Sequence, residues 1–195
     1  MTRNKSSVFV NIGASSHSKS KREEHDYYTT DPLAITILHR NGLLDNNNSY
    51  FDFCCGGGGN LGNELRRLGY HVEYESDLYD RGHGDIGVDF FTINQKVQGN
   101  TIANPPYKHI NDWIAHSLKI TSNKVYIFCR IQTIESMKRY QIFKKNPPIL
   151  ICPFVKRVKC YKNDDRTYKS SAVCYAWFIW DNTVDNTETK VKWLV

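Results

Sequence analysis

The segment Asn104-Pro105-Pro106-Tyr107 has residue types suited to holding a nitrogen atom for a chemical reaction. Two consecutive prolines keep the backbone extended and donate no N–H, so the neighbouring carbonyl groups stay free to accept hydrogen bonds. The side-chain oxygen of Asn104 and the carbonyl of Pro105 can therefore take the two protons of a planar amine or amide, and Tyr107 offers a ring face for stacking. The structural alternative is a turn at the end of a strand with a packed tyrosine.

An amino group on an aromatic ring is a poor nucleophile, because its lone pair is delocalised into the ring. Two fixed acceptors would reduce that conjugation and turn the lone pair toward an electrophilic carbon for in-line displacement. If the amino group belongs to a base of a nucleic-acid duplex, that base would first have to be extruded into a pocket with an aromatic wall. The segment thus predicts group transfer to an amine or amide nitrogen, and its four residues alone do not choose the substrate.

Four consecutive glycines, Gly56 to Gly59, form a second candidate site. They follow the apolar run 50–55, which is typical of a short buried strand, and precede residues 61–68, which have the pattern of a helix. Glycines at such a turn let backbone N–H groups approach a ligand at the start of the helix. Gly57, Gly59 and Gly62 also fit the spacing G-x-G-x-x-G, although glycine clusters occur in ordinary loops as well. The strand and the helix around the turn favour a cofactor site.

Acidic residues follow the glycine turn at the spacing expected of a nucleotide cofactor site. Asp77 lies about 20 residues past the turn, where a carboxylate can accept hydrogen bonds from ribose hydroxyl groups. Glu75 competes for this role. Asp89, further along the chain, could meet the amino group of an adenine ring. Each acid taken singly is better explained as an ordinary exposed carboxylate, and Asp77 gains only from its placement relative to Gly56 and Gly58.

Helices and strands are expected to alternate along the chain. Asp31 can cap a helix that begins at Pro32 and stops at Gly42, and Asn60 can cap the helix 61–68. Strands are expected at 50–55, 71–75, 101–103, 124–129, 149–159 and 172–180, with further helices at 111–119 and 133–145. This order predicts an α/β fold, a doubly wound and mostly parallel sheet with a C-terminal antiparallel hairpin.

The composition favours one folded domain with an anionic partner. The 195 residues fit a single domain, expected over residues 26–195 behind a flexible, basic arm of residues 1–25. The formal net charge of +6 favours a polyanion such as a nucleic acid. No C-x-x-C spacing predicts a metal site, and no stretch is apolar enough for a membrane span, so we expect a cytoplasmic protein without a metal.

Four stretches of the sequence resemble one known family. Residues Phe51 to Asn60 look like the D-P-C-C-G-G-G-N cofactor loop of compact class I DNA adenine-N6 methyltransferases of the kind carried by phages and prophages, with Phe53 in place of a proline. Residues Asp26 to Pro32 are similar to the family's D-Y-Y-x-T-P-P, with Asp31 in place of its first proline. Residues 134–140 and 170–180 are similar to its L-E-G-x-x-R-Y helix and its ending S-x-x-C-Y-A-W-F-V-W.

This resemblance implies a Rossmann-like class I methyltransferase fold, S-adenosylmethionine as cofactor and the N6 amino group of adenine in DNA as substrate. The catalytic residues would be Asn104, Pro105, Pro106 and Tyr107, with no metal and no obligate protein partner. The expected cofactor contacts are Tyr28, Thr30, Asp52, Cys54, Gly56, Gly58, Asn60, Asp77 and Asp89, of which Tyr28, Thr30, Asp52, Cys54 and Asn60 are implied by the resemblance alone.

The sequence offers only small elements for reading a target. No insertion is large enough for a separate target-recognition domain, so sequence readout is expected to be modest or carried by loops. Arg166 and Tyr168, in the loop 162–169, are candidate substrate contacts, and Phe154 with Arg157 is another pair. Each is explained equally well as part of a hairpin or of a surface patch.

Other activities share the same four-residue segment. Methylation of adenine in RNA is the nearest alternative, and methylation of guanine in RNA or of a glutamine amide in release factors needs the same two acceptors. About 25 polar residues before the expected domain are too few for the helical recognition domain of the glutamine enzymes. From other classes, a nucleic-acid-binding protein without activity, or a dinucleotide oxidoreductase suggested by the glycines, remains an alternative.

Overall fold

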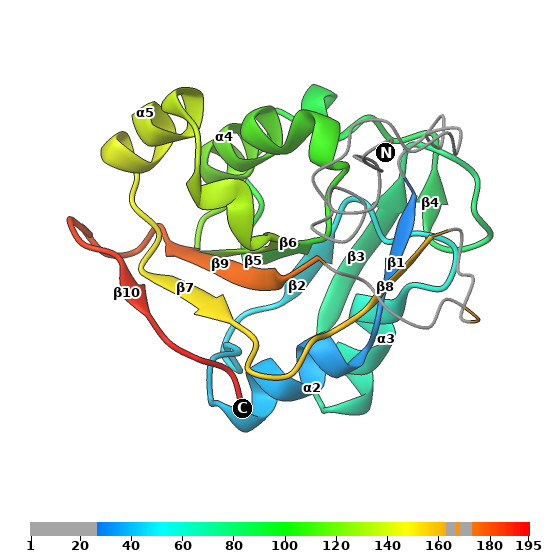
Figure 1. The fold of residues 1–195 in the computed structure, drawn as a ribbon. Coiled ribbons are helices and arrows are strands. Elements are labelled where there is room, and N and C mark those ends of the chain that lie inside the picture. The colour runs from blue at the N-terminus through cyan, green and yellow to red at the C-terminus, as the bar shows by residue number, and fades with distance from the viewer. Residues whose placement is uncertain (1–26, 163–166, 168–172) are drawn as a thin grey trace, which may run out of the picture.

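The computed structural model describes residues 27–162, 167 and 173–195. The expected N-terminal arm, the first residue of the D-Y-Y stretch, and the candidate contacts Arg166 and Tyr168 lie outside the described residues. The elements named below keep the labels of Figure 1.

An eight-stranded sheet runs through the molecule in the order β10-β7-β9-β6-β5-β2-β3-β4 (Figure 1). Neighbouring strands are parallel from β6 to β4, whereas β9 is antiparallel to both β6 and β7. The expected doubly wound, mostly parallel sheet with an antiparallel C-terminal pair is confirmed. The strands are β2 (Tyr50–Asp52), β3 (Val72–Asp77), β4 (Asp85–Ile86), β5 (Asn100–Ala103), β6 (Lys124–Arg130), β7 (Leu150–Pro153), β9 (Tyr175–Asp181) and β10 (Lys190–Val191).

Helices cover both faces of this sheet. In Figure 1, α4 (Ile110–Ile120) and α5 (Met137–Lys145) lie above the sheet, and α2 (Leu33–Arg40) and α3 (Asn60–Arg67) lie below it. The alternating side chains of β6 divide between the two layers, because successive residues of a strand point to opposite faces. Tyr126 and Phe128 belong to the core under α2 and α3, whereas Val125 and Ile127 belong to the core under α4.

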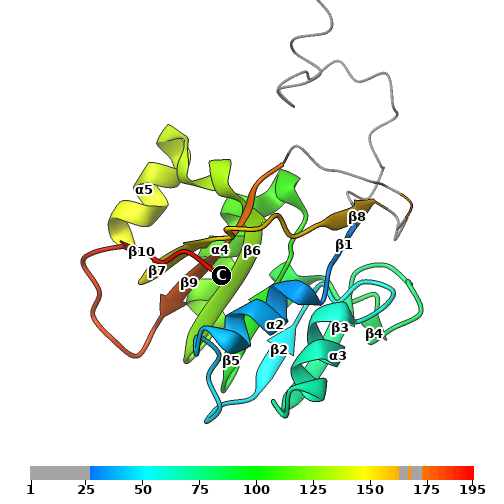
Figure 2. The same cartoon turned by 60° about the horizontal axis from the view of Figure 1, so that its bottom comes forward.

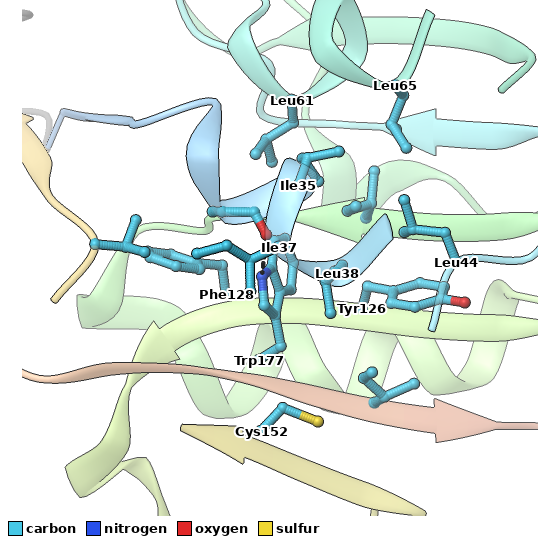
Figure 3. Packing of buried hydrophobic residues seen from close by; sticks show 14 of the residues in the cluster. Ile35, Ile37, Leu38, Leu44, Leu61, Leu65, Tyr126, Phe128, Cys152 and Trp177 are labelled. Atoms are coloured by element: carbon cyan, nitrogen blue, oxygen red, sulfur yellow. Dashed lines mark hydrogen bonds between the residues drawn. The ribbon is translucent and has the colours of Figure 1, made fainter. Parts of the chain in front are cut away.

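The core below the sheet in Figure 1 holds α2 against the sheet. Figure 3 shows Ile35 and Leu38 of α2 between Leu61 and Leu65 of α3 and the sheet residue Trp177. The indole Nε1 of Trp177 donates a hydrogen bond to the backbone carbonyl of Ala34 at 3.2 Å, so its polar atom is satisfied inside the apolar layer. This packing holds α2, and hence the strand that precedes it, against the sheet.

A second, two-stranded sheet joins segments far apart in the sequence. Strand β1 (Tyr28–Thr30) pairs antiparallel with β8 (Cys160–Lys162), and the two run side by side in Figure 2. The hydroxyl of Tyr161 donates to the carboxylate of Asp31 at 3.0 Å, which extends the contact past the strand ends. The expected single strand 149–159 is therefore wrong, since β7 ends at Pro153 and the chain crosses to β1.

Other element boundaries also differ from expectation. Asn60 does not cap α3: Gly59 is the N-cap, in the left-handed conformation with φ 53°, and Asn60 is the first helical residue. The expected helix 133–145 divides into the 3₁₀ turn η3 (Ile131–Ile134) and α5, because Ser136 caps α5 by accepting from the Arg139 N–H. Strand β2 ends at Asp52, three residues earlier than expected.

Candidate active site

A cavity of about 530 Å³ opens where β2, β3 and β5 end. The carboxyl ends of parallel strands meet at one edge of a doubly wound sheet, and ligands bind in the crevice outside that edge. The chain runs from β2 through β3 to β4 on one side of β2 and then returns to β5 on the other side, so this is where the strand order reverses. The sequence-predicted residues that line the cavity are Tyr28, Thr30, Asp52, Cys54, Gly56, Asn60, Asp77, Asp89, Asn104 and Pro106.

Five other predicted site residues are described but do not line this cavity. Pro105 is buried, and Gly58 and Tyr107 lie next to lining residues in the chain. Phe154 packs on Phe128 of the core, with 6.0 Å between ring centroids, and Arg157 is exposed. The structure thus brings together the strand-end motifs but places Phe154 and Arg157 outside them.

Asp52 ends β2 at the floor of the cavity. One carboxylate oxygen accepts the N–H of Cys54 at 3.0 Å, whereas the other, Oδ2, is buried and has no hydrogen-bond partner among the described residues. Burial, together with the nearby carboxylates Glu75 and Asp77, raises the pKa of Asp52 to about 8. The buried hydroxyl of Thr29, which also lines the cavity, lacks a partner in the same part of the chain. Unsatisfied buried polar atoms on a cavity wall indicate a polar ligand.

Of the two acids that compete for the end of β3, only Asp77 lines the cavity. Its carboxylate accepts the N–H of Gly56 at 3.1 Å and the N–H of Tyr79 at 3.0 Å, and so ties the glycine turn to the end of β3. Glu75 points instead toward α3, where it pairs with Arg66 at 2.6 Å and lies 3.2 Å from the ring of His83.

The glycine turn is closely packed by side chains from other segments. The N–H of Gly57 donates to the hydroxyl of Tyr27 at 3.0 Å, and a Cβ on Gly57 would lie 2.5 Å from the carbonyl oxygen of Arg81. The guanidinium of Arg81 lies 4.0 Å from the centre of the Tyr27 ring. Tyr27 and Arg81 both line the cavity, so they form the wall above the glycine turn.

Aromatic rings form another wall. Phe90 stacks on Trp113 with 4.1 Å between ring centroids, and Phe91 meets the same indole edge-on at 5.7 Å. Asp89 fixes the start of this segment, because its carboxylate accepts the N–H of Phe91 at 3.0 Å. This end of the cavity is flat and apolar with a carboxylate at its border, which suits a ring that carries an amino group.

Asn104, the residue after β5, faces the cavity with its side-chain amide held on three sides. The amide nitrogen Nδ2 donates to the backbone carbonyl of Tyr28 at 3.1 Å and to the hydroxyl of Thr30 at 2.8 Å. The amide oxygen Oδ1 accepts from the hydroxyl of Tyr107 at 3.2 Å. Both N–H groups of the amide thus donate to protein acceptors, and the oxygen keeps one lone pair free to accept.

Tyr107 is packed on several sides. Its ring stacks with Tyr28 at 5.9 Å, lies 6.4 Å from the ring of Tyr175, and has the guanidinium of Arg130 at 4.9 Å from its centre. The expectation that its ring face is open to a flat substrate stays a prediction. Among these aromatic residues, Tyr28 is the one that lines the cavity beside Asn104.

Several lining residues were not expected from the sequence. Tyr27 precedes the two residues implied by the resemblance, and the pair Phe90 and Phe91 directly follows Asp89. Trp113 lies on α4 in an apolar stripe whose pattern reads only as core. The aromatic pair beside a candidate cofactor acid was the available signal, whereas nothing local distinguishes Arg81 from a surface arginine.

The part of the chain that the structure describes holds no candidate membrane span and no candidate metal site. No helix in that part of the chain is long and apolar enough to cross a membrane. Across residues 27–162, 167 and 173–195, no group of three or more histidine, cysteine or acidic side chains could hold a metal ion. The six cysteines are free, and five of them are buried or half-buried, whereas Cys174 is exposed.

Solved structures match the fold, whereas no protein-family model and no curated protein sequence matches the chain. A Listeria monocytogenes protein described as a class I S-adenosylmethionine-dependent methyltransferase matches with TM-score 0.54 and 11% identity over 96% of this chain and 71% of that one. The type I restriction-modification methyltransferase subunit of Streptococcus thermophilus matches with TM-score 0.60 and 10% identity over 86% of this chain and 47% of that one.

A dimethyladenosine transferase from Plasmodium falciparum matches with TM-score 0.52 and 12% identity over 80% of this chain and 62% of its own. The chain spans about half the length of the restriction-modification subunit. With the sheet order described above, these likenesses establish that the chain has the class I methyltransferase fold, as the sequence resemblance implied.

Proposed function

We propose that this protein transfers a methyl group from S-adenosylmethionine to the N6 amino group of adenine in DNA. The observation that carries the proposal is the fixed amide of Asn104, which presents only its oxygen to a cavity at the strand ends of a methyltransferase fold. Because Nδ2 is already bonded to two protein acceptors, a group that binds this amide must be a hydrogen-bond donor. An amine with two protons would use Asn104 Oδ1 and the neighbouring carbonyl of Pro105.

The cavity has the size and polarity that S-adenosylmethionine requires. Its volume of about 530 Å³ lies within the range of cofactor pockets. The cofactor, when bound, supplies a methyl group on a positively charged sulfur, and it carries an amine and ribose hydroxyl groups. The unpartnered Asp52 Oδ2 and Thr29 hydroxyl offer acceptors to such donors, and Asp77 lies at the end of the neighbouring strand. The carboxylates of Asp77 and Asp89 on the wall favour a cationic ligand, and such a ligand would in turn favour the ionised form of Asp52.

The aromatic wall supports the position of the cofactor's adenine ring. Phe90 and Phe91 directly follow Asp89, so an adenine lying on these rings would have a carboxylate beside its amino group. The oxygen of Asp89 that does not accept from Phe91 has no partner among the described residues, which leaves it available as an acceptor. This arrangement supports the role assigned to Asp89 from the sequence.

DNA is the preferred substrate for two reasons. The net charge of +6 favours a polyanion, and the best-fitting structural match named above comes from a restriction-modification enzyme. The resemblance of the sequence to DNA adenine-N6 methyltransferases points the same way. Adenine in RNA remains the second candidate, because a dimethyladenosine transferase shares the fold as well.

The test is to express the chain in a bacterial host that lacks adenine methylation of its own. Host DNA and RNA are then digested separately, and N6-methyladenine is measured in each by mass spectrometry. We expect the modified base in DNA from cells with the wild-type chain. Its appearance in RNA alone would transfer the function to the second candidate.

The matched variant Asn104→Ala is expected to bind S-adenosylmethionine with little change in affinity, because Asn104 lies apart from the glycine turn. We expect the rate of methyl transfer to fall by about 10²-fold or more, since the variant deletes an acceptor used as the amine becomes pyramidal. Cofactor affinity is measured by calorimetry, and turnover by transfer of a labelled methyl group. Wild-type turnover in Asn104→Ala would refute the assignment of the reacting site.

A further inference from the structure

Two hydroxyl groups, those of Tyr107 and Thr30, contact the side-chain amide of Asn104. Tyr107 does not line the cavity, yet its hydroxyl lies 3.2 Å from the Oδ1 of Asn104. Thr30 reaches the other end of the same amide, with its hydroxyl 2.8 Å from Nδ2. The two hydroxyls therefore contact opposite ends of the group that is proposed to receive the substrate amine.

The backbone carbonyl of Tyr28 distinguishes the nitrogen of the Asn104 amide from its oxygen. A carbonyl oxygen can only accept, so its 3.1 Å contact identifies the facing amide atom as the nitrogen. The hydroxyls of Thr30 and Tyr107 can each donate or accept, and they adopt the sense that this carbonyl imposes. The two hydroxyls also restrain the χ2 angle of Asn104, and with it the orientation of the amide plane. One carbonyl contact alone would leave the side chain free to rotate about this angle.

We propose that Tyr107 and Thr30 are positioning residues whose hydroxyl groups fix the plane of the Asn104 amide, so that the free lone pair of Oδ1 faces the cavity. The inference rests on the proposed function for its substrate, the amine, but not for its geometry. It differs from a stacking role because the hydroxyl acts through Asn104 and the ring need not touch the base.

The surroundings of Tyr107 keep its hydroxyl in the donor form. Burial, with the neighbouring Cys160 and Tyr175, raises the pKa of Tyr107 well above its ordinary value. The phenol consequently retains its proton across the pH range in which proteins stay folded. The contact of Arg130 with the ring face, at 4.9 Å, holds the ring that carries this hydroxyl.

The decisive variant is Tyr107→Phe, which removes the hydroxyl and keeps the ring. We expect kcat for methyl transfer to fall about tenfold, while KM for DNA and the affinity for S-adenosylmethionine stay within a factor of about two. Thr30→Val should also lower kcat, and the conservative Thr30→Ser should restore it; cofactor affinity is measured separately for both variants, because Thr30 lines the cavity as an expected cofactor contact. Tyr70→Phe is the matched control, because the hydroxyl of Tyr70 bonds His39 at 2.9 Å, away from the cavity.

A second measurement does not depend on turnover. The side-chain amide resonances of Asn104, assigned by their absence in Asn104→Ala, are followed by NMR hydrogen exchange. We expect slow exchange in the wild type and in Tyr70→Phe, and exchange about tenfold faster or more in Tyr107→Phe. Unchanged exchange in Tyr107→Phe, or a rise in KM with unchanged kcat, would overturn the positioning role. If Tyr107→Phe speeds the exchange of the Asn104 amide but the wild-type chain methylates no nucleic acid, the positioning role stands and the proposed function is rejected.

Discussion

At the scale of single residues, Asp52 is where burial and charge oppose each other most strongly. Its carboxyl is 1% exposed, it lies near Glu75 and Asp77, and its pKa is raised to about 8. The native protein therefore holds this proton more tightly than the unfolded chain does. A cationic ligand at the cavity floor would reverse that balance, because the ionised form would gain a partner.

Linkage gives the sign of the effect on stability. A carboxyl with a raised pKa contributes stability that is complete below its unfolded-state pKa, near 3.8, and is lost as the pH rises through about 8. We expect Asp52→Asn to remove this loss. The free energy of unfolding of the variant, relative to that of the wild type, should therefore increase as the pH rises from about 4 to about 8. Urea denaturation at a series of pH values measures the difference.

The control for Asp52→Asn is Asp112→Asn, which changes an exposed carboxyl of the same cavity. Its difference from the wild type should stay nearly constant over the same pH range. Parallel curves for Asp52→Asn and the wild type would show that Asp52 does not titrate as its burial requires.

At the scale of elements, the packing of α3 on β3 explains one glycine of the G-x-G-x-x-G pattern. A Cβ on Gly62 would lie 2.1 Å from Oε1 of Glu75, whose other oxygen, Oε2, contacts Arg66 and His83. Gly62 therefore leaves room between α3 and β3 for the buried carboxylate of Glu75, whose ionic partner Arg66 is 44% exposed. The pattern predicted the glycine, and the structure gives Gly62 a packing role against Glu75, neither of which lines the cavity.

Gly62→Ala is expected to lower the free energy of unfolding by about 1–3 kcal/mol, because the added methyl group must displace the pinned carboxylate. Chemical denaturation measures this loss. In a Glu75→Ala background the same substitution should cost much less, since the obstructing side chain is gone. Equal costs in both backgrounds would place the strain elsewhere in the helix.

Other elements separate what local sequence specifies from what it does not. The glycine turn and the Asn-Pro-Pro-Tyr segment were predicted at strand ends because their signals lie within a few consecutive residues. The pairing of β1 with β8 was missed because no periodicity encodes a partner far along the chain. Tyr27 was missed for the same reason: its role comes from contact with Gly57, which lies 30 positions later.

At the scale of the whole molecule, the fold class could be predicted because strand and helix signals alternate along the chain. That alternation and the preference for right-handed crossovers predict a parallel sheet, whereas the order of its strands, which brings β2, β3 and β5 together at one edge, is known only from the structure. The break before α5 could not be predicted, since Ser136 reads equally well as a helical residue until its hydroxyl is seen to cap the next turn.

The two-stranded ribbon of β1 and β8 also determines when the site can form during synthesis. Thr30 and the Tyr28 carbonyl hold Asn104, but their strand pairs with residues that are made much later, as the 130-position separation of Asp31 and Tyr161 illustrates. A nascent chain that has already released the glycine turn and Asn104 from the ribosome still lacks β8 and β9. Contacts this remote form late in folding. The contacts that hold Asn104 are therefore complete only after the chain has been made through β8.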